Sequence, residues 1–287
     1  MELLTYPFML RALTGALIIG LVAPALGIYL VQRRLSLIGD GIGHVALTGV
    51  GVGLLTNNSP VLAAVLVATI GAVGVELIRE RGRTSGDLAL ALLFYGGIAG
   101  GVVLVGLSDN GNSNLMQYLF GSLLTTSPQD LVVIGGLGAG VLIAMLALRP
   151  ALFALCNDEE FARVSGLPVR TLNILLAVVT AVTVTIAMRT VGLLLVSALM
   201  VVPVAAAQQV TRGFRTTMAA AMLIGVAAAG AGIVVSAEAD TAPGATTVLL
   251  ALVAFLGTTL AAAVRRMLAR RSHPPVAAEP PDVVLHG

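Results

Sequence analysis

The sequence predicts an all-α fold, a polytopic transmembrane helical bundle of about nine helices. Of the 287 residues, 57% are hydrophobic and only 10% are charged, and the mean hydropathy is +1.01. A soluble domain would carry about 25% charged residues. The apolar runs have about 20 residues, as a membrane-spanning helix requires, and not the alternating pattern of about 10 residues that a barrel strand shows. Because lipid cannot satisfy backbone polar groups, these runs are expected to be helices.

Nine apolar segments qualify as spans. They cover 8–31, 37–55, 61–78, 88–107, 131–148, 172–188, 191–207, 216–235 and 246–267. The connection from Met188 to Val191 is so short that the sixth and seventh segments form either two full spans or one broken helix, which leaves eight or nine crossings. Residues 1–271 are therefore expected to form one transmembrane domain, and the proline-rich residues 272–287 a disordered cytoplasmic tail.

The arginines predict how the chain is oriented in the cytoplasmic membrane. All 16 basic residues are arginine, and they follow spans one, three, five, seven and nine, with only Arg11 and Arg189 on the opposite side. Cytoplasmic loops are enriched in basic residues. The N-terminus is therefore expected outside the cell and the C-terminus in the cytoplasm.

Asp40 and His44 are the most informative polar residues. They stand one helical turn apart in a stretch of otherwise apolar and small residues, with Ser36 and Thr48 extending the same polar stripe. An ionisable residue inside a membrane costs roughly 2.5 kcal/mol or more on insertion scales, and such residues usually mark a transport path. Carboxylate and imidazole are also ligands of first-row metals. The alternative is that the two side chains hydrogen-bond each other or a neighbouring helix for packing alone.

One Asp–His pair supplies too few ligands for a divalent cation. A twofold axis beside this helix would bring two Asp and two His together, a set that suits zinc or manganese. The stripe is thus expected to face protein or a water-filled path. Conduction also needs a site that binds weakly enough to release its ion.

A second informative segment is the loop after the fifth span, residues 157–168. Asn157 or Asp158 can cap a short helix whose first turn is acidic, and Gly166 with Pro168 ends it. This pattern predicts either a docking element for a soluble partner or an interfacial helix without one.

Several enzyme classes have no support in the sequence. A P-loop needs a lysine, and the chain has none, so ATP hydrolysis by that route must belong to another subunit. No H-E-x-x-H or G-x-S-x-G motif occurs, and the chain itself is not expected to be an enzyme. Glu76 is expected to pair with Arg79 or Arg81 for structure. Pro203 should kink or interrupt the seventh span and could act as a gating bend.

Five motifs carry a resemblance to a known family. They are YPFMLRAL at 6–13, LSLIGDGIGHVALTG at 35–49, YLFGSLL at 118–124, DEEFARVSGLP at 158–168 and VGLLLVSALMVVPVAAA at 191–207. In this order they resemble the permease subunits of bacterial ABC importers for zinc, manganese and related metals, a family with an Asp and a His four residues apart at this place.

The resemblance implies a homodimeric permease that moves a zinc, manganese or iron cation and binds no permanent cofactor. Asp40 and His44 would be the pathway ligands. A cytoplasmic ATPase would dock on the helix near 157–168, and an extracytoplasmic metal-binding protein would deliver the cargo. The docking contacts would come from Asp158, Glu159, Phe161, Ala162 and Gly166.

Two other functions stay open at this point. A proton- or ion-coupled secondary transporter could use Asp40 and His44 as a relay, but it would not need a docking helix. A permease for iron chelates or cobalamin has a related architecture, but it would not need a paired Asp and His on a narrow, glycine-rich helix.

Overall fold

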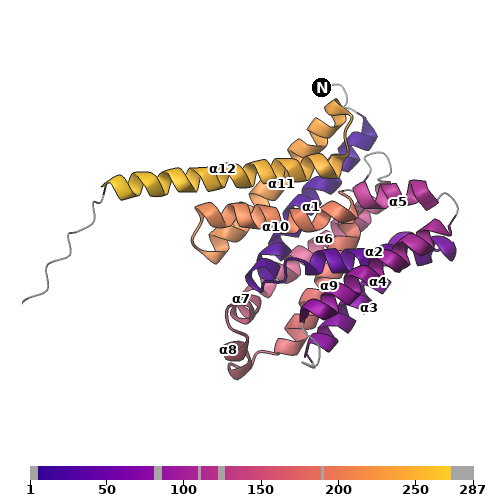
Figure 1. Cartoon of the computed structure of the whole chain (residues 1–287), viewed down its shortest axis with the longest axis horizontal. Helices are drawn as coiled ribbons and strands as arrows, with labels where there is room; N and C mark the ends of the chain where they lie inside the picture. The colour runs from indigo at the N-terminus through magenta and orange to yellow at the C-terminus, as the bar shows by residue number, and fades with distance from the viewer. Residues whose placement is uncertain (1–5, 81–85, 109–110, 122–126, 189–190, 273–287) are drawn as a thin grey trace, which may run out of the picture.

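The computed structural model describes residues 6–80, 86–108, 111–121, 127–188 and 191–272, and within these ranges the regular structure is entirely α-helical. Figure 1 shows the helices packed side by side, with α7 and α8 together at one end and α12 reaching beyond the others. The helices are α1 (Pro7–Gln32), α2 (Ile38–Leu55), α3 (Pro60–Glu80), α4 (Gly86–Gly106), α5 (Gly111–Phe120), α6 (Pro128–Ala147), α7 (Arg149–Asn157), α8 (Glu159–Val164), α9 (Val169–Met188), α10 (Leu193–Val210), α11 (Phe214–Ala239) and α12 (Pro243–Ser272).

The sequence marks where many of these helices begin. Four long helices start on a proline, whose fixed φ suits the first turn and whose missing N–H is not needed there; these are Pro7, Pro60, Pro128 and Pro243. Helix α6 also has a capping box, in which the hydroxyl of Ser127 accepts from the backbone N–H of Asp130 at 3.1 Å and the carboxylate of Asp130 accepts from the N–H of Ser127 at 3.0 Å.

Eight helices are long and apolar enough to cross a membrane, and α10 is a shorter apolar helix. All nine predicted segments are helical in the structure. Helices α9 and α10 are separate, and Gly192 between them has a φ of +91°. Helix α10 has 18 residues, so it is about 27 Å long, slightly less than the bilayer core.

Contacts at its two ends place α10 between the start of α12 and the start of α11. At its start, Gly244 of α12 packs on the carbonyl of Val191, so closely that a Cβ at this position would overlap the oxygen. At its other end, the hydroxyls of Thr211 and Thr217 are hydrogen-bonded at 2.7 Å, next to the start of α11. Pro203 lies inside α10, which continues past it; of the expected kink or interruption, the interruption does not occur and the kink stays a prediction. Its role as a gating bend stays a prediction.

Two short helices were not expected from the sequence. Helix α5 occupies a Gly/Asn-rich segment between the fourth and fifth predicted spans, and α7 lies between α6 and the predicted docking helix. The last described residue of α12 is Ser272, so the predicted disordered tail falls, from residue 273 on, outside the described residues.

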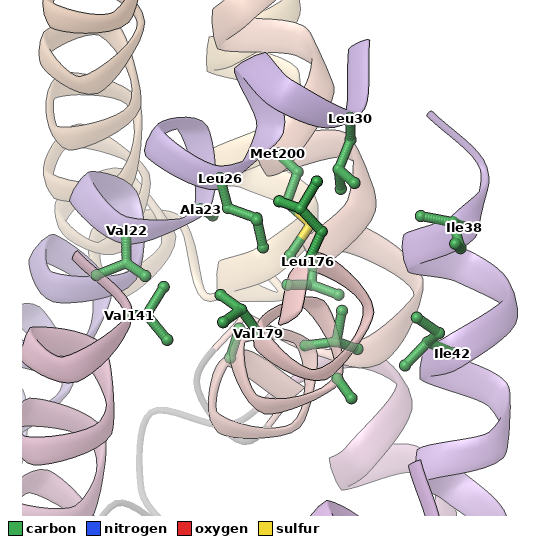
Figure 2. Close-up of a cluster of buried hydrophobic side chains, with 14 of the residues drawn as sticks. Val22, Ala23, Leu26, Leu30, Ile38, Ile42, Val141, Leu176, Val179 and Met200 are labelled. Carbon is green, nitrogen blue, oxygen red and sulfur yellow. The ribbon is translucent and has the colours of Figure 1, made fainter. Parts of the chain in front are cut away.

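The core lies between α1, α2, α6, α9 and α10. Figure 2 shows apolar side chains from these helices in one buried cluster: Val22, Ala23, Leu26, Leu30, Ile38, Ile42, Val141, Leu176, Val179 and Met200. Helix α9 is buried along most of its length, whereas α4, α6 and α12 expose much of their apolar surface. In a membrane that surface is available to lipid or to another protein.

Candidate metal site

Helix α2 carries the predicted ligands on the side opposite its core face. Ile38 and Ile42 of α2 are buried in the cluster of Figure 2. Asp40 lies two residues after Ile38, and His44 lies two residues after Ile42. In an α-helix a step of two residues turns the direction of the side chain by about 200°. The pair therefore faces away from the core.

His44 is buried, with 6% of its surface exposed, and its ring packs against α4. The centroids of His44 and Phe94 are 4.5 Å apart at an interplanar angle of 80°, an edge-to-face contact. The Nδ1 atom of His44 has no hydrogen-bond partner, and among the described residues the only other buried side-chain N or O atom in this condition is Ser197 Oγ. An unpaired buried polar atom costs about 1–3 kcal/mol, and a bound cation or a water molecule at Nδ1 would offset that cost.

Glycine allows α4 to approach α2 closely beside His44. A Cβ at Gly97 would lie 2.6 Å from the carbonyl carbon of His44 and from the backbone nitrogen of Val45. One turn further along α2, the hydroxyl of Thr48 donates to the carbonyl of Gly97 at 2.9 Å. The part of the polar stripe formed by His44 and Thr48 therefore lies against α4.

Asp40 is half-buried and lines an open cavity between α2 and α4. The cavity has a volume of about 410 Å³ and is lined by Leu37, Asp40, Leu90, Ala91, Phe94 and Tyr95. Apart from Asp40 and the hydroxyl of Tyr95, the lining side chains are apolar. A cation in this cavity would find one carboxylate, with the imidazole of His44 one turn deeper along the same helix.

The pair lies nearer one end of the bundle than its centre. Asp40 is the third residue of α2 and His44 the seventh, so they lie about 3 and 9 Å from the start of the helix. A carboxylate at this depth is closer to water than one at the bilayer centre, where insertion costs are largest. Arg33, a short turn before α2, contacts Glu159 of α8, so the start of α2 lies at the same end of the molecule as α8.

The described residues of one chain do not complete a metal site. Within the described part of the chain, no group of three or more His, Cys, Asp or Glu side chains is placed to hold an ion. Asp40 and His44 can contribute two ligands, and a divalent cation needs further oxygen or nitrogen atoms from water or from a second copy.

The predicted docking helix is present but shorter than the segment 157–168. Helix α8 spans Glu159–Val164, and the carboxylate of Asp158 caps it by accepting from the N–H of Phe161 at 2.9 Å. Gly166, with a φ of +80°, follows the helix end. Phe161 and Val164 are 64% and 89% exposed, whereas Ala162 is buried.

Charged and polar side chains from the end of α1 and from α3, α8 and α9 gather at this end of the bundle. Arg33, directly after α1, donates to the carboxylate of Glu159 at 2.7 Å and to the amide oxygen of Asn173 on α9. On α3, Arg79 donates to Glu76 at 2.8 Å, which confirms the structural pairing expected for Glu76. Burial lowers the pKa of Arg33, the nearby Arg79 lowers it further and Glu159 raises it, yet a guanidinium stays protonated in proteins. We call Arg33, Glu76, Arg79, Glu159 and Asn173 the charged end.

Several of these residues were not predicted from the sequence. Phe94, Tyr95 and Gly97 surround the pair, but their spacing on α4 gave no sign of it. Arg33 was noted only for its charge. Asn173 carried a weak signal, because an amide near the start of an apolar helix needs a partner.

Comparison with known proteins decides the family. A model described as the ABC 3 transport family matches residues 5–262. The chain belongs to this family. It is 32% identical to the manganese transport system membrane protein MntC of Halalkalibacterium halodurans, over 88% of this chain and 87% of that protein. It is 29% identical to the high-affinity zinc uptake system membrane protein ZnuB of Haemophilus influenzae, over 88% of this chain and 96% of that protein.

A solved structure shows the same fold. PsaBC from Streptococcus pneumoniae, determined in complex with a Fab, matches with a TM-score of 0.85 at 26% identity, covering 94% of this chain and 97% of that chain. The chain is therefore a multi-pass permease of the cell membrane. Membership of an ABC family goes against the secondary-transporter alternative.

Proposed function

We propose that two copies of this chain form the membrane path of an ATP-driven importer for a divalent cation, namely zinc, manganese or iron. The observation that carries the proposal is that Asp40, which lines an open cavity, lies one helical turn from the buried imidazole of His44, whose Nδ1 atom has no hydrogen-bond partner. Carboxylate and imidazole groups bind all three metals, and the names of the relatives include manganese and zinc transport. The cation is cargo, and no permanent cofactor is needed.

A second copy of the chain would complete the coordination. A twofold axis beside the cavity would double the ligands to two carboxylates and two imidazoles, because each copy then contributes the same residues. The open cavity at Asp40 and the exposed apolar residues around it, Leu37 at 66% and Tyr95 at 70%, offer a surface for this contact. Four such ligands can hold a cation, and partial hydration keeps release possible.

Helix α8 is the proposed contact for a cytoplasmic ATPase. Its apolar side chains Phe161 and Val164 are exposed and offer a surface for a partner, and the carboxylate of Asp158 caps the helix. The proposed contact residues are Asp158, Phe161, Ala162 and Gly166, as predicted from the sequence. Glu159, which was predicted with them, is paired with Arg33, so we propose that it couples α8 to the bundle and does not itself dock. Since the chain lacks a P-loop lysine, the partner would hydrolyse ATP.

The arginine distribution supports a cytoplasmic position for α8 and the C-terminus and an outer position for the N-terminus. Residues 1–271 would then form the permease domain and 272–287 a cytoplasmic tail. On the outer side, a metal-binding protein would deliver the cation.

The experiment is cation uptake by cells that carry Asp40→Asn or His44→Leu, measured for zinc, manganese and iron with the permease level checked. Both replacements keep the volume of the side chain, so the packing against Phe94 is largely preserved. We expect uptake of the transported cation to fall at least about tenfold, the loss typical of changes at metal sites. Undiminished uptake by the double variant would rule out the assignment.

A matched control is His273→Ala, which also removes a histidine but lies beyond α12. It should leave uptake unchanged. The stoichiometry of the purified permease gives an independent check: the proposal requires one cation for two chains, and one cation per chain would exclude the shared site.

A further inference from the structure

We propose that Arg33 transmits movement of the docking helix α8 to helix α2, which carries Asp40 and His44. The inference rests on the proposed function, because movement of α8 matters only if a partner acts on it. It assigns to Arg33 a positioning role: the side chain would make α2 follow α8 during transport, without contacting the cation.

The side chain of Arg33 joins α1, α8 and α9 at one buried point. Only 8% of the side chain is exposed, and its guanidinium donates to Glu159, the first residue of α8, and to Asn173 of α9. These partners are 126 and 140 residues away in the sequence. A planar guanidinium with several donors in fixed directions holds two such partners in a defined geometry.

The backbone connects Arg33 to the ligand helix through a tight turn. Arg34 has a left-handed φ of 59°, and the N–H of Leu35 donates to the carbonyl of Leu30 at 2.8 Å, which closes the end of α1. The N–H of Ile38 then donates to the carbonyl of Leu35 at 3.0 Å, which starts α2. Asp40 lies in the first turn of that helix. A displacement of Arg33 is therefore carried to Asp40 through seven residues with little slack.

Burial makes the link between Arg33 and Glu159 difficult to break. A guanidinium cannot lose its charge in a protein, so moving Glu159 away would leave a buried, uncompensated cation. When α8 moves, Arg33 is expected to follow it. The contact of Glu159 with Arg163 differs, because it measures 3.5 Å, lies within α8 and involves an arginine side chain that is 69% exposed. Such a contact contributes little.

The test compares cation uptake and ATP hydrolysis in proteoliposomes that contain the permease with its ATPase. Glu159→Gln removes the charge and keeps the shape, and Arg33→Lys keeps the charge but removes the planar fork. We expect both variants to retain the ATPase on purification and to hydrolyse ATP, but to take up at least about fivefold fewer cations per ATP, the size of a typical coupling effect.

Two further variants separate coupling from simple stability. Arg163→Gln removes the exposed partner of the same Glu159 and should leave the uptake per ATP unchanged. Arg33→Glu and Glu159→Arg should each lower the uptake per ATP, and the double variant that combines them should recover part of this loss. The affinity of the purified permease for Mn²⁺ should stay at the wild-type value in all these variants, because Arg33 is not a ligand.

The outcomes also distinguish this inference from the function on which it rests. In one outcome the wild type retains the ATPase and transports, but Glu159→Gln and Arg33→Lys take up as many cations per ATP as the wild type. The link through Arg33 is then wrong, and the proposed function stands. Loss of ATPase binding in Glu159→Gln would likewise overturn the link, since Glu159 would then act at the docking surface. A wild type that neither retains an ATPase nor takes up a cation would contradict the proposed function itself.

Discussion

The contact between α2 and α4 and the charged end use polar groups in opposite ways. Beside α4, His44 is buried with an unpaired Nδ1, and the two helices meet through glycine and a single side-chain hydrogen bond among the described contacts, from Thr48 to Gly97. At the charged end, Glu76 pairs with Arg79 at 2.8 Å, and Glu159 pairs with Arg33 at 2.7 Å. The two regions are separated by the first turn of α2.

The difference follows from what each region has to do. A site that passes a cation must leave ligand atoms free for it, and a buried unpaired atom is tolerated when the surrounding helices hold it in place. A region that passes on movement needs its charges joined, because a buried charge cannot be separated from its partner without a large penalty. The following changes test this division, from the largest expected effect to the smallest.

Gly97→Ala should have the largest effect, because it separates the helices that hold the site. The added methyl group would lie 2.6 Å from backbone atoms of His44 and Val45, which cannot move aside as a flexible side chain can. Overpacking of this kind costs about 1–3 kcal/mol. We expect a lower thermal stability of the purified permease and a loss of most cation uptake.

Gly96→Ala is the matched control for this change. A Cβ at Gly96 meets nothing within 4 Å, and alanine favours a helix, so stability should stay the same or rise slightly. If Gly97→Ala and Gly96→Ala had equal stability and uptake, α2 and α4 would not approach each other as closely as they do in the structure.

Glu76→Gln should have a smaller effect and mainly on stability. The side chains of Glu76 and Arg79 are 7% and 26% exposed, whereas those of Glu80 and Arg170, a second pair that involves the same helix, are 44% and 65% exposed. Loss of the more buried pair should cost about 1–2 kcal/mol and loss of the exposed pair less than about 0.5 kcal/mol. Thermal unfolding of Glu76→Gln and Glu80→Gln, measured side by side, checks this. A larger loss for Glu80→Gln would contradict it.

The spanning helices could be predicted from the sequence because lipid imposes a simple rule on it. A run of about 20 apolar residues has to be a helix, and prolines such as Pro60 and Pro128 mark helix starts. Helices α5 and α7 were missed because they have only 10 and 9 residues and neither has to cross the membrane. The Gly/Asn-rich composition of α5 is typical of a turn, and α7 follows α6 with no polar linker to separate the two.

The candidate site was predictable only as far as it lies on one helix. Asp40 and His44 are one turn apart, so their spacing places them on a common face. Phe94 and Gly97 come from another helix, and Glu159 and Asn173 meet Arg33 across more than 100 residues. Helix periodicity indicates which face is buried but not which helix covers it, so these contacts needed the structure.

Phe94→Leu should have the smallest of these effects and should act on the cation site alone. The edge-to-face contact with His44, at 4.5 Å between ring centroids, fixes the orientation of the imidazole. Contacts of this type contribute about 0.5–1.5 kcal/mol. Without the contact, the imidazole has to be ordered when the cation binds, which lowers the affinity for the cation by a similar free energy. We expect the affinity of the purified permease for Zn²⁺ and Mn²⁺, measured by calorimetry, to fall about fivefold, with thermal stability nearly unchanged.

Two neighbouring variants make this last prediction specific. Phe94→Tyr keeps the ring edge and should keep the affinity, whereas Leu92→Ala, at a position that is 65% exposed on the same helix, should change neither affinity nor stability. Neither the retained ATPase nor the uptake per ATP should respond to Phe94→Leu, because Phe94 touches the ligand and not the charged end. A change in the uptake per ATP at unchanged affinity would mean that α4 also belongs to the path along which movement is transmitted, and the division between the two regions would be wrong.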